Sequence, residues 1–294
     1  MDERKLKYIS LGPTIKSCRI INGITICKFI ASFNMKSFMD GKYDYIFIDE
    51  ISMVQEIYYK FFIYLKRANP KIKFIIAGDF EQLMPVKDRI KKCDYKNSLA
   101  LHNLCDGNKL QLTKCRRSDD TLFNMLLPEN INNITKNTFT NHFTNQHISF
   151  TNAKRIEINK RMMDQVVRQK RKMPLRLNKL DYDKNSQNVE LLAGMPIIAR
   201  INAKYFDICN NELFTITKIN KEFIFIQDES DKQIEIPIDK FQKFFYVAYC
   251  ITTHKSQGST FSHGYTIHEY DKFDSRLKYV ALSRSTDIKN INIV

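Results

Sequence analysis

The stretch YIFIDEISM, residues 45–53, begins as an almost unbroken apolar run of strand length and then turns into two adjacent carboxylates. Such a run predicts a parallel strand buried on both faces, with Asp49 and Glu50 at its C-terminal end. Ligands of α/β sheets bind at that edge. In phosphoryl-transfer enzymes, one acid there holds Mg²⁺ and its neighbour positions the attacking water. The alternative is a core strand followed by a solvated Asp-Glu turn, because a short motif alone is weak evidence.

A second strand pattern follows one helix length later. Residues 73–79, KFIIAGD, form another apolar run that ends in Gly-Asp, and FEQLMPV follows as residues 80–86. Residues 54–68 between the two runs have the length of one helix, so the spacing predicts a βαβ unit with polar groups at one edge. In this order, YIFIDEISMV and FIIAGDFEQLMPV resemble motifs II and III of superfamily 1 helicases. The resemblance is to the 5′-to-3′ group of RecD-like and Dda-like enzymes.

Composition limits the class of protein. The 294 residues are enough for one large or two modest domains, and 43% hydrophobic and 27% charged residues are ordinary for a globular chain. The formal net charge of +15 indicates an anionic polymer as partner. The alternative is a generally basic surface that serves solubility.

Location is indicated by what the sequence lacks. No apolar run approaches the ~20 residues of a membrane span, and the N-terminus does not lead into the apolar core of a signal peptide. The seven cysteines stand singly, without a C-x-x-C motif. That pattern favours a reducing compartment and argues against a zinc site or a disulfide framework. We therefore expect an intracellular protein, in the cytoplasm, the nucleus or a viral replication site, with no membrane partner.

The most specific motif lies near the C-terminus. VAYCITTHKSQGSTFSHGYTIHE, residues 247–269, reads as a short strand and a polar loop of the kind that packs close to phosphates. It matches motif V of the same helicases almost residue for residue. A metal site at His254 is the competing interpretation, and no second ligand stands at a suitable spacing. KYVALSRSTDIKNINIV, residues 278–294, resembles motif VI, with a helix that delivers Arg284 and a closing strand.

Two shorter segments extend the resemblance. Residues 8–33 resemble motif Ia, in which the region of Pro13 and Thr14 touches DNA phosphates, although alone these residues are equally typical of a plain loop. Cys27 is a departure, since many relatives carry His there. LQLTKCRRSDD, residues 110–120, resembles motif IV, and the register of the family favours Arg117 over Arg116 as the γ-phosphate contact. Without the resemblance, paired arginines are more typical of a solvated turn.

From Gly194 the pattern changes to short alternating strands separated by Asn-rich and Asp-rich turns, which predicts a small antiparallel barrel. It resembles the SH3-like insert, domain 2B, of RecD-like helicases. The resemblance implies an α/β fold of two RecA-like P-loop NTPase lobes with parallel sheets. We expect the first lobe at 1–118, the second at 119–193 and 247–294, and the insert at 194–246. Thr151 would lie at the DNA-facing edge of the second lobe.

The phosphate-binding loop of these enzymes, G-x-x-x-x-G-K-S/T, does not occur in the 294 residues. In the family it lies just upstream of motif Ia. The sequence is therefore expected to be a fragment, a split gene product or a degenerate helicase, truncated in its first lobe. We expect it to bind ATP poorly and turn it over little on its own.

The resemblance implies an ATP-dependent helicase or translocase on single-stranded DNA and duplex junctions, moving 5′ to 3′, in DNA replication or repair. ATP and Mg²⁺ are the implied cofactors, and the absent P-loop segment or a replication or repair protein would be a partner. The alternatives are a non-catalytic nucleic-acid-binding remnant and an RNA helicase, because the motifs do not reveal 2′-hydroxyl contacts. The resemblance assigns catalysis to Asp49, the Mg²⁺ ligand, and to Glu50, Gln82, Arg117 and Arg284; nucleotide binding to Asp49, Gln82, Arg117, Gly258 and Arg284; and nucleic-acid binding to Pro13, Thr14, Thr151, Thr253, His254 and Lys255.

Overall fold

The computed structural model describes residues 6–85, 94–139 and 143–294. Contacts between residues divide the chain into two compact units, Met1–Lys114 and Cys115–Val294. In the part of the chain that the structure describes, no helix is long and apolar enough to cross a bilayer.

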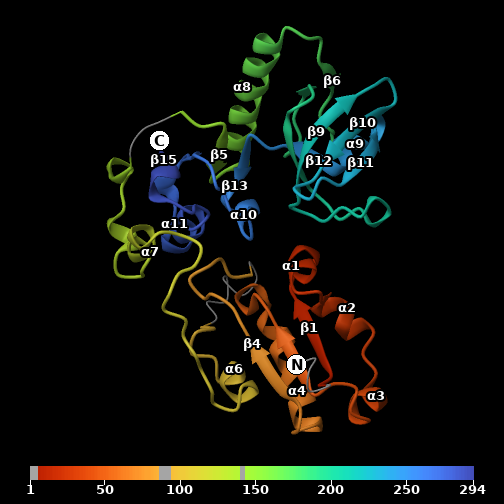
Figure 1. The fold of residues 1–294 in the computed structure, drawn as a ribbon, viewed down its shortest axis with the longest axis vertical. Coiled ribbons are helices and arrows are strands. Elements are labelled where there is room, and N and C mark those ends of the chain that lie inside the picture. The colour runs from red at the N-terminus through yellow and green to blue at the C-terminus, as the bar shows by residue number, and fades with distance from the viewer. Residues whose placement is uncertain (1–5, 86–93, 140–142) are drawn as a thin grey trace. The chain divides into compact units, whose positions relative to one another are not determined.

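The first unit is built on a four-stranded parallel sheet (Figure 1). Its strands are β1 (Tyr8–Gly12), β2 (Ile24–Thr25), β3 (Tyr45–Ile48) and β4 (Lys73–Ile76), in the spatial order β2-β1-β3-β4. The predicted strand at residue 45 therefore lies inside the sheet, paired with β1 on one side and β4 on the other. Because all four strands are parallel, their carboxyl ends share one edge.

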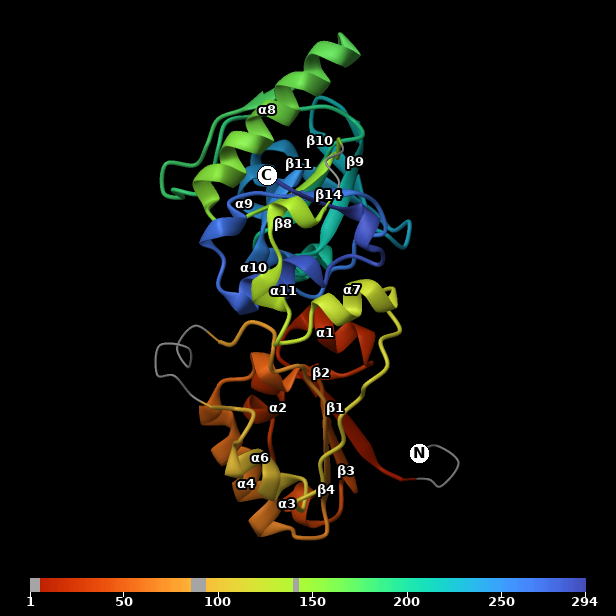
Figure 2. The ribbon, with the colours of Figure 1, turned by 90° about the vertical axis from the view of Figure 1, so that its left-hand side faces the viewer.

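Helices cover this sheet because their apolar residues recur on one side. Helix α4 (Glu56–Ala68) fills the predicted crossover and buries Tyr59, Phe62 and Leu65, which are spaced three residues apart. Figure 2 shows α4 and α6 (Leu99–Leu104) on the same face of the sheet. The other helices in the described part of this unit are α1 (Ile15–Ile20), α2 (Ile26–Ala31), α3 (Met35–Met39) and the short 3₁₀ turn η2 (Ile51–Met53).

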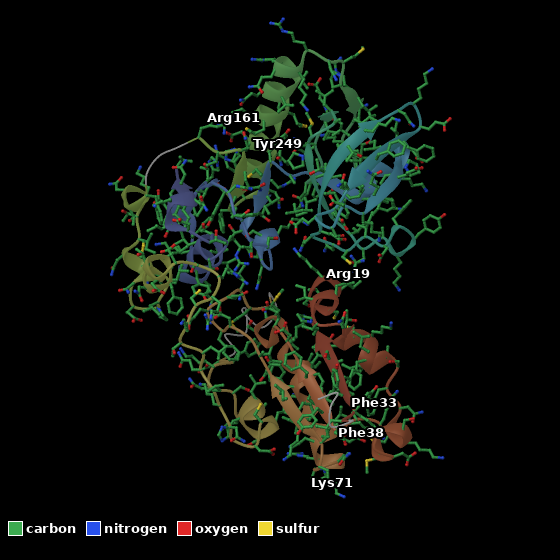
Figure 3. The ribbon with its side chains drawn as sticks, in the orientation of Figure 1. Arg19, Phe33, Phe38, Lys71, Arg161 and Tyr249 are labelled. Carbon is green, nitrogen blue, oxygen red and sulfur yellow. The ribbon has the colours of Figure 1, made fainter. Side chains whose placement is uncertain are left out.

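Aromatic side chains hold α2 and α3 to the core of the first unit. Phe33 and Phe38, labelled in Figure 3, have ring centroids 5.4 Å apart, and Phe33 also meets Phe61 of α4 edge to face at 5.4 Å. Phe29 lies 5.7 Å from Phe33. Such pairs add to the stability that comes from burial alone.

The second unit contains another four-stranded parallel sheet. Its strands are β5 (Gln146–Ser149), β13 (Cys250–Thr252), β14 (Tyr265–Ile267) and β15 (Ile291–Ile293), in the order β13-β5-β14-β15. The long helix α8 (Asn152–Lys170) follows β5 and packs on β5 and β13. The other helical segments are α7 (Asp120–Met125), α10 (Thr253–Ser256), α11 (Ser275–Leu282), η3 (Ile131–Asn133), η4 (Lys136–Thr138), η6 (Tyr270–Lys272) and η7 (Ile288–Asn290).

An antiparallel sheet is inserted between α8 and β13. Its order is β11-β10-β9-β8-β12, formed by β8 (Pro196–Ala199), β9 (Leu213–Ile219), β10 (Phe223–Gln227), β11 (Gln233–Pro237) and β12 (Phe245–Val247). The expected antiparallel strands are therefore present, and Asn211 in the turn before β9 has a φ of 66°. The sheet shares one apolar core with Ile158 and Met162 of α8. The insert is completed by β6 (Leu175–Leu177), β7 (Val189–Leu191), η5 (Lys204–Phe206) and α9 (Ile238–Phe244).

Two histidines are buried inside the second unit. His147 of β5 and His268, which follows β14, are 5% and 6% exposed, and Nε2 of His268 lies 3.1 Å from Nδ1 of His147. Burial, with help from neighbouring cations, lowers the pKa of both imidazoles to about 4. Both rings are therefore neutral near pH 7, and each must be protonated at a cost when the protein is acidified.

This pair predicts a loss of stability in acid. Between about pH 6.5 and pH 4 the unfolded chain binds protons that the folded chain does not, so the free energy of unfolding falls as pH falls through that window. His268→Gln should flatten this dependence by on the order of 2 kcal/mol. The check is urea unfolding across the window, with the exposed His263→Gln as control. Equal pH dependence in both variants would contradict the prediction.

Candidate functional site

Three strands of the first unit end with polar or turn residues at the same edge. Pro13 and Thr14 follow β1, Asp49 and Glu50 follow β3, and Gln82 lies in the loop after β4. The amide of Asp49 donates to the carbonyl of Leu11 at 2.9 Å, so the chain stays paired one residue beyond the strand. Both carboxylates are half-buried. The sheet thus places the predicted acids where parallel sheets bind ligands.

The turn that carries Glu50 is fixed by its close contact with the residues that follow β4. Glu50 itself has a φ of 52°, in the left-handed region that few residues other than Gly adopt. The amide of Ile51 donates to the carbonyl of Ala77 at 3.0 Å, which ties the turn to the end of β4. A Cβ on Gly78 would lie 2.7 Å from Cγ2 and 2.9 Å from the backbone nitrogen of Ile51. Gly78 is therefore required for the close approach of the two strand ends.

Asp79 orders the loop that bears Gln82, a role that the sequence alone did not assign. Its carboxylate accepts from the amide of Glu81 at 3.0 Å and from Nε2 of Gln82 at 3.4 Å. Its carbonyl accepts from the amide of Gln82 at 3.2 Å. The position of Asp79 at the end of an apolar strand was the available signal, but the sequence did not reveal which group it would hold.

Thr14 uses its side chain inside the fold. It is the N-cap of α1, and its Oγ1 accepts from the amide of Ser17 at 3.1 Å in a capping box. Thr14 is exposed and Pro13 is half-buried. The turn at Pro13 and Thr14 is thus fixed by the hydrogen bonds between Thr14 and Ser17 at the start of α1.

In the second unit, the carboxyl edge of the parallel sheet gathers Thr151 and the residues after β13. Thr151 caps α8, and both its amide and its hydroxyl donate to the carboxylate of Glu269, the amide at 2.9 Å. Glu269 follows β14, so this pair joins two strand ends. In the sequence, Glu269 is only the last residue of the motif V segment, and its partner Thr151 could not be identified because it lies 118 residues away.

The three motif V residues predicted to bind nucleic acid differ in exposure. Thr253 is fully buried, and its hydroxyl donates to the carbonyl of Ser149 at 3.3 Å. His254 is exposed. Lys255 is half-buried, and its Nζ donates to Oδ1 of Asn211 at 2.7 Å. In this conformation, His254 offers the most accessible side chain of the three.

Arg284 is 1% exposed, and its guanidinium donates to groups of the second unit. Nε bonds to the carbonyl of Val280 at 2.9 Å, Nη1 to that of Ser259 at 3.1 Å, and Nη2 to Oγ of Ser283 at 2.9 Å.

Gly258 has a φ of 79° and is exposed, with open space around it. Arg117 is also exposed and belongs to the second unit, as does Arg284.

The carboxyl edge of the first sheet fits part of a nucleotide and magnesium site. Within the described residues, no group of three or more His, Cys, Asp or Glu is arranged to hold a metal. Mg²⁺ in nucleotide enzymes is held by one or two carboxylates, with water and phosphate oxygens as the other ligands. Asp49 meets that requirement. The sequence contributes no Gly-rich loop with a Lys to hold the phosphates themselves.

Comparison with known proteins connects this arrangement to one fold. No family model and no curated protein matches the sequence. Solved structures match over almost the entire chain. A Bacteroides Pif1 bound to single-stranded DNA has a TM-score of 0.71 at 18% identity, covering 99% of this chain and 83% of that chain. The chain has the fold of Pif1 helicases. Pif1 from Candida albicans gives a TM-score of 0.69 at 16% identity, covering 98% and 84%.

The structural matches confirm the predicted fold class, an α/β fold of two RecA-like lobes with parallel sheets, and this is the fold that the resemblance to superfamily 1 helicases implied. The likeness of the antiparallel insert to an SH3 barrel, the lobe boundaries at 118/119, 193/194 and 246/247, and the roles of individual residues stay predictions. A third match, described as two coordinating Pif1 helicases unwinding forked duplex DNA, has a TM-score of 0.67 at 19% identity, covering 99% of this chain and 82% of that chain.

The close approach of Gly78 to Ile51 predicts that a side chain at position 78 will destabilise the first unit. Gly78→Ala should destabilise the first unit by about 1–3 kcal/mol, because the new methyl group meets the backbone of Ile51 as well as its side chain. Adding Ile51→Ala should not restore the loss, since the backbone contact remains. Urea unfolding of the single and double variants is the measurement. A Gly78→Ala protein as stable as the wild type would contradict the close approach.

Proposed function

We propose that this chain is an ATP-dependent helicase that translocates on single-stranded DNA, 5′ to 3′. The observation that carries the proposal is the pair Asp49 and Glu50, held in a strained, tightly packed turn at the carboxyl edge of a helicase-type sheet. A protein that only bound nucleic acid would gain nothing from these acids. Strained backbone is typical of functional sites.

Each predicted residue has a chemical task in this proposal. Asp49 would hold Mg²⁺, which supplies charge neutralisation at the phosphates when bound. Glu50 would orient the attacking water and accept its proton. Gln82, oriented by Asp79, would contact the γ-phosphate. Arg117 and Arg284 would neutralise the charge that develops on the phosphoryl oxygens.

The nucleic-acid partner is supported by charge and by the neighbours. The net charge of +15 suits a polyanion. Solved Pif1 structures with this fold are described as bound to single-stranded DNA and, in one case, to ADP-AlF₃ as well. In the proposal, Pro13, Thr14, Thr151, Thr253, His254 and Lys255 lie on or near the DNA path, and duplex junctions are the substrate.

The missing G-x-x-x-x-G-K-S/T motif sets a condition on activity. Without backbone amides and a Lys to hold the phosphates, these 294 residues should bind nucleotide weakly. Turnover is therefore expected only when such a loop is supplied by another polypeptide segment. The second candidate function is a nucleic-acid-binding protein without catalysis, which the net charge of +15 alone would suit.

ATP hydrolysis separates the two functions. The chain alone should show no DNA-stimulated hydrolysis above that of Glu50→Gln. Joining a strand and a phosphate loop ahead of Tyr8 should produce DNA-stimulated hydrolysis, and Glu50→Gln in that protein should lower it by about 10²-fold or more while ATP binding persists. Restored hydrolysis that is unaffected by Glu50→Gln would remove Glu50 as the base. No hydrolysis with intact ATP binding would favour the non-catalytic alternative.

DNA binding should depend strongly on salt. If phosphate contacts supply the affinity, the logarithm of the binding constant for oligo(dT) falls linearly with the logarithm of salt concentration, by about 0.7 per contact. Fluorescence anisotropy over a salt series measures this slope, and a matched RNA oligonucleotide tests the choice between DNA and RNA. A slope near zero would contradict phosphate contacts as the basis of binding.

A further inference from the structure

Tyr246 of β12 is surrounded by three cations within the second unit. The Cζ atoms of Arg155 and Arg200 lie 4.6 Å and 5.1 Å from its ring centroid, and Nζ of Lys255 lies 5.9 Å away. These residues come from α8, from the residue after β8 and from α10. The ring is 8% exposed, so it interacts with the cations in a place largely shielded from water. We refer to Arg155, Arg200, Lys255 and Tyr246 as the Tyr246 cluster.

The cluster has more positive than negative charge. Asp183 forms an ion pair with Nη1 of Arg200 at 2.9 Å and accepts from the hydroxyl of Tyr246 at 2.6 Å. Elsewhere in the cluster the acceptors are neutral. Nε of Arg155 donates to Oδ1 of Asn152 and Nη2 to the carbonyl of Asn185, while Lys255 donates to Asn211. In the described part of the chain, the cluster thus has three cations and one carboxylate, which pairs with Arg200.

One donor in the cluster has no acceptor. Arg155 is 1% exposed, and its Nη1 is buried with no hydrogen-bond partner in the described residues. A buried charged donor without a partner is destabilising and is rare in folded proteins. Lys255 shows the same excess of positive charge, because burial and the charges of Arg155 and Arg200 lower its pKa to about 8. An anion beside these groups would relieve both penalties.

We propose that the Tyr246 cluster is a binding site for a phosphate oxyanion. Its oxygens would accept from Nη1 of Arg155 and from Lys255, replacing Asn211 as the partner of Nζ. Arg200 and Lys255 are half-buried and Arg155 is 1% exposed, so in this proposal the anion approaches from the side of Arg200 and Lys255. Arginine suits this role because its planar fork stays charged and matches the geometry of phosphate oxygens.

The phosphate has two plausible sources, a nucleic-acid backbone and a free phosphate ion. Both offer the same oxyanion. The site shares Lys255 with the proposed DNA path, so the inference rests in part on the proposed function. Phosphate binding is measured without ATP or DNA, so failure of this site can be told apart from failure of the proposed function.

Binding of inorganic phosphate tests the site. Sodium phosphate is titrated by calorimetry against sodium chloride at matched ionic strength. The proteins are the wild type, Arg155→Met, Arg200→Met and the control Arg161→Met. Arg161, labelled in Figure 3, is exposed on the same helix as Arg155 and undergoes the same charge change. We expect saturable binding in the wild type and the control, and binding weakened about tenfold or more in the two cluster variants.

Competition with a short oligo(dT) identifies the source. If phosphate displaces the oligonucleotide, and Arg155→Met weakens oligo(dT) binding more than Arg161→Met does, the natural ligand is a backbone phosphate. Saturable phosphate binding without competition supports the site with a free phosphate as ligand. The proposal is overturned if phosphate binds the wild type and Arg155→Met equally. It is also overturned if phosphate does not bind and Arg155→Met and Arg161→Met bind oligo(dT) alike. Should Arg155→Met fail to fold, Arg200→Met and Lys255→Met carry the test.

Discussion

The structure of the first unit depends on the pairing of β3 between two parallel neighbours. Main-chain hydrogen bonds continue past the end of β3 on both sides, from Asp49 to Leu11 and from Ile51 to Ala77. A backbone donor buried there without a partner would be costly, so these bonds determine where the chain turns. They also fix the turn at Glu50, whose positive φ would otherwise be unfavourable. The placement of the two acids is thus a consequence of sheet pairing, and the lack of a side chain at Gly78 permits it.

Much of the fold could be predicted from the sequence because its signals are local. An apolar run of strand length, a helix-length spacer and a second run identify the βαβ unit around β3 and β4, and the short alternating runs after Gly194 identify the antiparallel strands. Motif order then identifies the two parallel lobes. The acids at the end of β3 lie where the sequence placed them, at the carboxyl edge of a parallel sheet.

The polar contacts around the site could not be predicted, because their partners are distant in sequence. Glu269 accepts from Thr151 across 118 residues, and Asn159 of α8 bonds to the backbone of Cys250 across 91. Thr253 is another case, since its motif suggested a surface contact while the fold directs its hydroxyl to Ser149. The periodicity of α8 places Arg155 on the same face as Ile158 and Met162, but it does not reveal that a charged residue on this face is fully buried. Burial of a charged residue is set by tertiary packing, which no short window of sequence contains.

Arg155 and Arg284 show how the hydrogen bonds of a buried arginine bear on its role. Both are 1% exposed, and among the described residues they are the two largest fully buried side chains. Every guanidinium nitrogen of Arg284 donates to a group of the second unit, which joins α11 to the segment at Ser259. Turning Arg284 toward a phosphate would break these bonds, at about 1 kcal/mol each in net terms. The contact between Arg284 and the phosphoryl oxygens that we propose therefore requires these hydrogen bonds to rearrange. Arg155 has a nitrogen still without a partner, so an anion could bind it with its other bonds intact.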